Sequence, residues 1–241
     1  MKTIGIIPAR FHSTRFQGKV LADLGGKSVI QHVWENAKKS QMLDDLIIAA
    51  DDERIISAAQ GFGAKAVYTS PDQPSGTDRL IEVVNPIDVE VVVNIQGDEP
   101  LVRPEMVDEL ARALLDDKDI KMATLAKRIE DEAEIENPNV VKVAIDRQGY
   151  ALYFSRARIP YPRFETVKPY FKHLGLYSYT KDFLFEFANL PKSNLEMTEG
   201  LEQLRALENG CRIKVIETKF DTIGIDTPED LERARSYLGL G

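Results

Sequence analysis

The sequence predicts an α/β fold with a mostly parallel central sheet. Through the first half of the chain, apolar runs of strand length alternate with helical segments of roughly ten residues, a pattern typical of βαβ units. In the second half, two apolar runs flank Asp146-Arg147-Gln148-Gly149, a turn sequence that indicates an antiparallel hairpin. We therefore expect one domain over residues 1–241, with a mixed-sheet insertion at about 127–195.

The first half predicts strands at its short apolar runs, residues 3–8, 46–50, 66–68 and 91–95. Helices are expected between them. The first follows Ser28, a favourable N-cap, and has its apolar positions between residues 29 and 37; the others span 52–62, 77–84 and 104–115. Pro104 suits the first turn of the last of these helices.

The second half predicts the hairpin strands 140–145 and 150–154, and further strands at 174–179 and 213–216. Helices are expected at 195–208 and 227–238. Thr227 is the expected N-cap of the second helix, and Pro228 suits its first position.

The composition excludes several classes of protein. A hydrophobic fraction of 43% can form a sizeable core, which argues against a disordered chain. No apolar run approaches the roughly 18 residues of a membrane span, and the run at the start is too short for a secretory signal. The net charge of −8 argues against nucleic-acid binding. Cys211 is the only cysteine, so we expect no intrachain disulfide, no cysteine zinc site and a cytoplasmic location.

The loop after the first strand is a candidate phosphate site. Residues 1–40 carry a net charge of +5, whereas the rest of the chain carries −13. Arg10, Arg15 and Lys19 lie just after a strand, at the edge where open α/β sheets bind ligands. Arginine can hold phosphate oxygens bidentately, and lysine adds a point charge. The alternative is an ordinary basic surface loop.

Two aspartates are candidate metal ligands. Asp98 follows the most apolar strand of the chain, and Asp226 follows a second apolar stretch that we interpret as a strand. A carboxylate in such a place needs a metal, a cation or a turn, because an isolated buried charge is costly. Two carboxylates beside phosphates favour Mg²⁺. The alternative for Asp226 is a role at the start of the helix that follows it.

The remaining candidates carry weaker signals. Arg156 ends an aromatic strand and could hold a substrate carboxylate, or form a surface ion pair. Glu202 and Gln203 are expected on a helix, where they resemble ordinary exposed polar residues. The histidines lack the spacing of zinc ligands.

Several segments resemble the CMP-KDO synthetases, the 3-deoxy-manno-octulosonate cytidylyltransferases of bacterial lipopolysaccharide synthesis. The resemblance covers essentially the whole chain. It is carried by Ile7-Pro8-Ala9-Arg10, Ser13-Thr14-Arg15, Gly18-Lys19, Ser75-Gly76-Thr77-Asp78-Arg79, Asn94-Ile95-Gln96-Gly97-Asp98-Glu99-Pro100, Tyr153-Phe154-Ser155-Arg156, His173-Leu174-Gly175-Leu176-Tyr177, Leu201-Glu202-Gln203-Leu204-Arg205 and Asp226-Thr227-Pro228-Glu229-Asp230-Leu231.

The resemblance implies a Rossmann-like nucleotidyltransferase fold and the transfer of CMP from CTP to KDO, with release of diphosphate. It implies that the triphosphate is held by Arg10, Ser13, Arg15 and Lys19, and that Ser75, Gly76 and Arg79 lie along the cytidine. Asp98 and Asp226 are implied to hold Mg²⁺, and with Arg10 and Lys19 they form the implied catalytic set. The implied contacts of the sugar acid are Gln96, Arg156, His173, Tyr177, Glu202 and Gln203. The family also implies a homodimer.

Gln17, Val20 and Ser28 stand where the family commonly has proline, but these departures remove no charged ligand.

Two alternatives remain. Within enzymes, the acceptor could be the 8-amino analogue of KDO or an acylneuraminate. Outside enzymes, a module that only binds CTP would keep the basic loop but would not need both Asp98 and Asp226.

Overall fold

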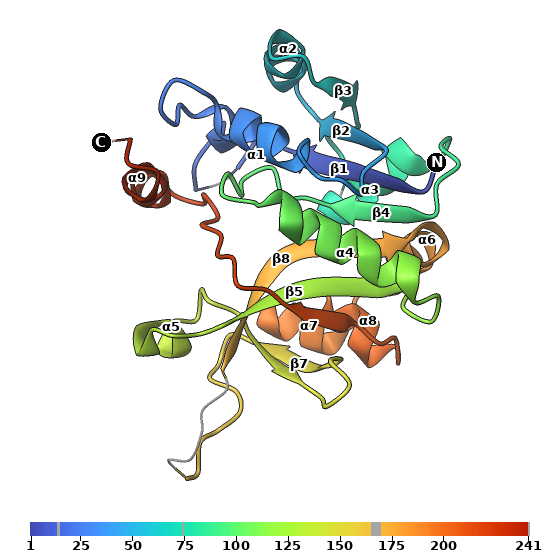
Figure 1. Cartoon of the computed structure of the whole chain (residues 1–241), viewed down its shortest axis with the longest axis vertical. Coiled ribbons are helices and arrows are strands. Elements are labelled where there is room, and N and C mark those ends of the chain that lie inside the picture. Colours follow the sequence, from blue (N-terminus) through green and yellow to red (C-terminus); the bar gives the residue numbers. More distant parts are fainter. Residues whose placement is uncertain (14, 74, 165–169, 241) are drawn as a thin grey trace.

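A computed structural model describes residues 1–13, 15–73, 75–164 and 170–240 of the chain. The strands of its central sheet lie in the order β3-β2-β1-β4-β8-β5-β9, and β6 and β7 extend from β8. Figure 1 shows this sheet running through the molecule, with the hairpin arm at one end. The predicted α/β fold is confirmed.

The parallel part of the sheet comes from the first half of the chain. It contains β1 (Thr3–Ala9), β2 (Asp45–Ala50), β3 (Lys65–Tyr68) and β4 (Val91–Asn94). The helices between them are α1 (Val29–Ala37), α2 (Glu53–Gly61), α3 (Gly76–Val84) and α4 (Pro104–Asp116). The predicted strands and helices of this half are therefore confirmed, within one or two residues at their ends.

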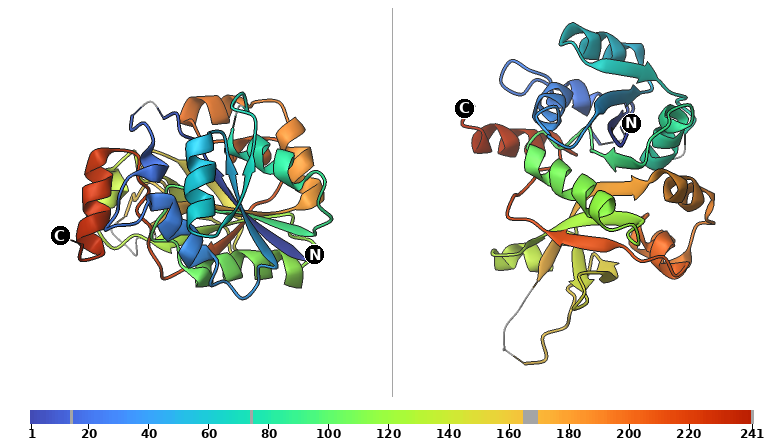
Figure 2. Two further views of the ribbon diagram at one scale, coloured as in Figure 1. Left: turned by 90° about the horizontal axis from the view of Figure 1, so that it is seen from above. Right: turned by 45° about the vertical axis from the view of Figure 1, so that its right-hand side comes forward.

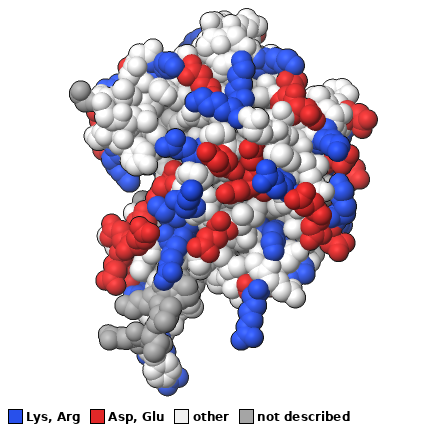
Figure 3. Space-filling view, viewed as in Figure 1, with Lys and Arg blue, Asp and Glu red and all other residues white. Residues whose placement is uncertain are grey.

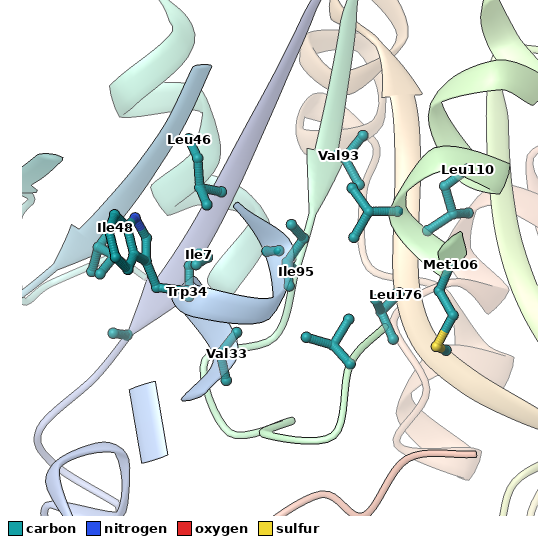
Figure 4. Packing of buried hydrophobic residues seen from close by; sticks show 14 of the residues in the cluster. Ile7, Val33, Trp34, Leu46, Ile48, Val93, Ile95, Met106, Leu110 and Leu176 are labelled. Carbon is teal, nitrogen blue, oxygen red and sulfur yellow. The ribbon is translucent and has the colours of Figure 1, made fainter. Parts of the chain in front are cut away.

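Two apolar clusters cover the two faces of the sheet. On one face, Val33 and Trp34 of α1 and Met106 of α4 pack against Ile7 and Val93 (Figure 4). On the other face, α3 and α6 (Lys181–Asn189) bury residues such as Leu80 and Phe187. Figure 2 shows the helices on both sides of the strands. Because both faces are covered, the central strands are continuous apolar runs.

The second half of the chain turns the sheet into a mixed one. The long strand β8 (Phe171–Thr180) is antiparallel to both of its neighbours, β4 and β5 (Met122–Arg128), and β9 (Lys214–Glu217) is parallel to β5. The predicted hairpin is β6 (Lys142–Ile145) and β7 (Ala151–Ser155). Three elements of this half were not predicted: β5, α6 and the short helix α5 (Glu132–Glu136). The insertion at 127–195 stays a prediction, although its strand β8 lies inside the main sheet.

The predicted helix at 195–208 is wrong. Two short helices, α7 (Asn194–Glu199) and α8 (Leu204–Glu208), take its place. Gly200 ends α7 with a φ of 64°, a left-handed conformation that glycine adopts without steric cost. Glu202 and Gln203 consequently lie in the break between the helices rather than on a helix surface.

The segment before Asp226 is also not the strand that we expected. Residues 219–226 form no helix or strand, and Ile225 N–H donates to the carbonyl of Asp98 at 2.9 Å. The segment then enters α9 (Pro228–Tyr237), where Thr227 is the predicted N-cap. Figure 1 shows this chain running from β9 across the sheet to α9. None of the helices in the described ranges has the length and apolar character needed to cross a bilayer.

Candidate active site

The basic loop after β1 is closed at its base. Gly18 N–H donates to the carbonyl of Phe11 at 2.8 Å, and the positive φ of Gly18 lets the chain turn back there. Phe11 N–H is held in turn by Asp51 Oδ1 at the end of β2, at 2.9 Å. The loop leads into η1 (Lys19–Leu21), a single 3₁₀ turn that begins with Lys19.

A cavity of about 430 Å³ opens at the carboxyl ends of β1 and β4. It brings together several of the residues implied for the nucleotide and for catalysis, which are Arg10, Ser13, Lys19, Gly76 and Asp98. Gln96, which is implied for the sugar acid, also lines it. The amino end of α3 faces it, and a helix N-terminus favours phosphate. The position matches the edge at which open α/β sheets bind ligands.

Lys19 joins the two candidate metal ligands. Its Nζ lies 2.5 Å from Asp98 Oδ2 and 2.8 Å from Asp226 Oδ1. Burial alone lowers the pKa of Lys19, but the two carboxylates outweigh burial and raise that pKa above its usual value. Burial likewise opposes ionisation of Asp226, but Lys19 and Arg15 hold the pKa of that carboxyl below its usual range. One ammonium therefore bridges two carboxylates, and Arg15 supplies the second positive charge beside Asp226.

Asp226 does not cap the helix that follows it. Its second carboxylate oxygen pairs with Arg15 NH2 at 2.9 Å, whereas the Thr227 hydroxyl accepts from Asp230 N–H. The alternative that Asp226 caps this helix is therefore wrong, because Thr227 provides the cap. The loop contributes Arg15 and Lys19 to this centre, the segment after β4 contributes Asp98, and the C-terminal segment contributes Asp226.

The chemistry of this centre fits Mg²⁺. Asp98 and Asp226 offer carboxylate oxygens that already reach a single cation, the Lys19 ammonium. Across the described ranges, no three His, Cys, Asp or Glu side chains gather as a metal site. A metal held by two carboxylates takes its other ligands from water and substrate oxygens, as Mg²⁺ does at phosphates.

Two residues implied for the cytidine side lie outside this cavity. Arg79 is fully buried, where it pairs with Asp51 at 3.3 Å and contacts the Thr69 hydroxyl. Burial lowers the pKa of Arg79, and its Nε has no hydrogen-bond partner in the described structure. Ser75 caps α3 through Asp78 N–H. The structure therefore places Arg79 beneath the loop, where it supports Asp51.

A second cavity of about 610 Å³ lies between α5 and α9. Its lining residues include Arg15, Arg156, His173 and Asp226. Because Arg15 and Asp226 line it, this cavity adjoins the Lys19 centre, the cluster of Lys19, Asp98, Asp226 and Arg15. Figure 3 shows a notch on this side of the molecule, with acidic and basic side chains around it. The mixed charges suit a ligand that carries both an anionic group and hydroxyls.

His173 and Tyr177 both lie on β8, and His173 lines this cavity. His173 Nε2 is 2.9 Å from the Thr124 hydroxyl, and the ring packs edge-on against Phe154. Burial lowers the pKa of His173 to about 3, so the imidazole is neutral at physiological pH. Burial also raises the pKa of Tyr177 well above its usual value. Both side chains can serve only as neutral hydrogen-bonding groups.

Three other residues implied for the sugar acid lie nearer to the residues implied for the nucleotide. They are Glu202, Gln203 and Gln96. Glu202 accepts from the Thr77 hydroxyl of α3 at 2.8 Å and lines a third cavity together with Ser75. Gln203 is buried, and its Nε2 has no partner within the described residues. Gln96 Nε2 donates to Asn94 Oδ1 at 3.3 Å. The implied sugar residues are therefore not gathered in one cavity. Gln96 lines the first cavity, Arg156 and His173 line the second and Glu202 lines the third, whereas Tyr177 and Gln203 are buried.

Sequence reasoning missed two groups at this site. Glu99 is in the quoted Gln96–Pro100 motif, yet burial and the neighbouring Asp98 raise its pKa to about 8. Asp51 links the loop to Arg79, and its only sequence signal is its place directly after an apolar strand. Neither group could be recognised without knowing which neighbours pack against it.

Comparisons with known proteins show the family of this chain. Residues 4–216 match the cytidylyltransferase family model. The 3-deoxy-manno-octulosonate cytidylyltransferase of Solibacter usitatus is 54% identical and covers 96% of this chain and 92% of its own length. That of Geobacter sulfurreducens is 49% identical, covering 99% and 100%.

A solved structure gives the same result. CMP:2-keto-3-deoxy-manno-octonic acid synthetase, solved in complex with CTP, superposes with a TM-score of 0.95 at 42% identity. The match covers 100% of this chain and 99% of that one. The predicted resemblance and the nucleotidyltransferase fold are confirmed. The chain belongs to the 3-deoxy-manno-octulosonate cytidylyltransferase family.

Proposed function

We propose that this chain activates KDO for lipopolysaccharide synthesis by the reaction CTP + 3-deoxy-D-manno-octulosonate → CMP-KDO + diphosphate. The observation that carries the proposal is the full-length identity of about half to proteins named for this activity, together with the Lys19 centre at the sheet edge. The direct test mixes purified chain, CTP, KDO and Mg²⁺, and identifies CMP-KDO by mass spectrometry. Absence of that product would refute the proposal.

The triphosphate is assigned to the first cavity. Arg10, Ser13 and Lys19 line it, and Arg15 lies beside Asp226 at its border. These cations offset the repulsion between a triphosphate and a sugar carboxylate, and transfer to phosphorus depends mainly on positioning and charge neutralisation. Ser75 and Gly76 stand at the start of α3, next to the place assigned to cytidine. Arg79 does not line this cavity; it pairs with Asp51, which in turn accepts from Phe11 N–H in the loop.

The sugar acid is assigned to the second cavity and its border. Arg156 offers the planar fork that matches a carboxylate. Neutral His173 and Tyr177 supply hydrogen bonds to hydroxyls, and Gln96, Glu202 and Gln203 approach from the nucleotide side. The anomeric hydroxyl then attacks the α-phosphorus in line with the departing diphosphate.

Asp98 and Asp226 are the proposed Mg²⁺ ligands. When bound, the ion would neutralise phosphate charge and lower the pKa of the attacking hydroxyl. The support is the approach of both carboxylates to one ammonium. For this ion to bind, Lys19 must turn from the carboxylates to the phosphates.

We also propose a homodimer in the cytoplasm. Leu152 of β7, and Tyr161 and Phe164 of the loop that follows β7, are exposed at 64, 83 and 71%, and a second copy could cover these apolar side chains. The single cysteine, which rules out an intrachain disulfide, is consistent with a reducing compartment. Sedimentation of the purified chain tests the assembly: a monomer at micromolar concentration would contradict it.

A further inference from the structure

Arg156 is fixed on both sides of its backbone and along its side chain. Its N–H donates to Glu199 Oε2 at 2.9 Å, and its carbonyl accepts from Lys142 Nζ at 2.7 Å. The guanidinium donates from Nε to the carbonyl of Glu199 at 2.7 Å and from NH1 to that of Pro138 at 3.1 Å. NH2 makes no hydrogen bond within the described part of the chain, so it is free for a ligand.

Lys142 is a buried cation with no carboxylate partner among the described residues. It is 0% exposed, and its three N–H groups go to the carbonyls of Asn137, Val140 and Arg156, at 2.8, 2.6 and 2.7 Å. A buried charge is costly, and burial lowers the pKa of Lys142. Its contacts tie a turn to Arg156, and that turn contains Pro138, which itself accepts from the guanidinium. Lys142 thus holds Arg156 directly and through Pro138.

Glu199 is the second residue that holds Arg156 in place. It is the last residue of α7, and its carboxylate accepts from Ser155 Oγ at 2.6 Å, Arg156 N–H at 2.9 Å and the Tyr153 hydroxyl at 3.4 Å. Burial alone raises the pKa of Glu199, but these donors keep it below its usual value. The charged carboxylate therefore fastens the end of β7 to α7, where the chain breaks at Gly200.

We propose that Lys142 and Glu199 are positioning residues that orient the Arg156 guanidinium toward the carboxylate of the sugar acid. This inference rests on the proposed function, because that function supplies the carboxylate. Neither residue lines the place of the reacting atoms, and each acts only through Arg156. Their benefit is preorganisation: a fork fixed before binding loses less freedom when the ligand arrives.

The test measures steady-state kinetics of Lys142→Met and Glu199→Gln. Each substitution is expected to raise the KM for KDO at least about tenfold, more than it lowers kcat, with the KM for CTP within about twofold. Lys181→Met is the matched control, because Lys181 also donates to backbone carbonyls, those of Asn85 and Ile87, away from the site. The control should keep the KM for KDO.

A double-variant cycle separates positioning from general damage. If Lys142 acts through Arg156, then Lys142→Met combined with Arg156→Lys should be hardly worse for KDO than Arg156→Lys alone. Additive losses, or equal losses for CTP and KDO, overturn the inference. If Lys142→Met does not fold, the same cycle with Glu199→Gln decides. Failure of the wild-type chain to make CMP-KDO refutes the proposed function, whereas unchanged variants of an active chain refute only the positioning role.

Discussion

Asp98 and Asp226 come from distant parts of the chain, yet both contact the single ammonium of Lys19, at 2.5 and 2.8 Å. Without a cation between them, the two carboxylates would repel each other and one of their pKa values would rise. Lys19 thus occupies the place between the two carboxylates that we propose for Mg²⁺ when the nucleotide is bound. The same lysine is assigned to the triphosphate, so substrate binding must redistribute these charges.

We predict that Lys19→Ala and Arg15→Ala weaken CTP binding more than KDO binding. Each lost charge-assisted contact should cost about 1.5–3 kcal/mol. Titration calorimetry with each ligand measures the two losses. Lys27→Ala is the control, because Lys27 belongs to the same basic segment but pairs with Glu35 outside the cavity. An unchanged CTP affinity in both Lys19→Ala and Arg15→Ala would show that these residues do not hold the triphosphate.

Asp226→Asn is predicted to abolish turnover while leaving the melting temperature nearly unchanged. The variant keeps the shape of the side chain but loses the charge that we propose holds Mg²⁺ together with Asp98, and Asp98→Asn should behave alike. Thr227→Ala should do the opposite: it removes the N-cap of α9, costs about 1 kcal/mol of unfolding free energy and keeps turnover. Thermal denaturation and diphosphate release measure both quantities. Normal turnover in Asp226→Asn would contradict the metal role.

Arg156→Lys is expected to impair use of the sugar acid far more than CTP binding. An ammonium cannot match a carboxylate bidentately, and it cannot keep the bonds that Nε and NH1 make to Glu199 and Pro138. The loss should appear in the KM for KDO, by about one to two orders of magnitude for a charge-assisted bond. Unaltered KDO kinetics would make Arg156 a structural residue.

His173 should stay neutral over the physiological range. Its pKa is lowered to about 3 by burial, whereas the unfolded chain protonates its histidines near about 6.5. Below that pH the unfolded state binds the extra proton, so the unfolding free energy falls as the pH falls toward the folded value, by about 1.4 kcal/mol per pH unit. Denaturation of wild type and His173→Gln between pH 4 and 8 isolates this contribution. An imidazole NMR signal that titrates near pH 6.5 would contradict it.

The parallel half of the fold follows from local patterns. Apolar runs such as 91–95, and caps such as Ser28 and Thr227, identify strands and helix ends without any tertiary knowledge. The second half does not. Phe183 and Phe187 of α6 are aromatic residues with high strand propensity, and their burial against the sheet outweighs that propensity in a helix that Thr180 caps.

The candidate site likewise has residues that local patterns predict and residues whose role depends on tertiary contacts. The basic loop and Asp98 follow strands, so their meeting at the sheet edge could be predicted from topology alone. Asp226 reaches the same place on an extended segment rather than a strand, held by the bond from Ile225 to Asp98. The burial of Arg79 and the link between Lys142 and Arg156 depend on side-chain contacts that no local pattern encodes.

The central claim is that this chain transfers the cytidylyl group to KDO. Diphosphate release tests it most directly when the four common nucleoside triphosphates are crossed with KDO, 8-amino-KDO and N-acetylneuraminate, in the presence of Mg²⁺. We expect release with CTP and KDO, and loss of that release in Asp226→Asn. Preference for 8-amino-KDO or N-acetylneuraminate would correct the acceptor, and binding of CTP without release with any acceptor would refute the proposed activity.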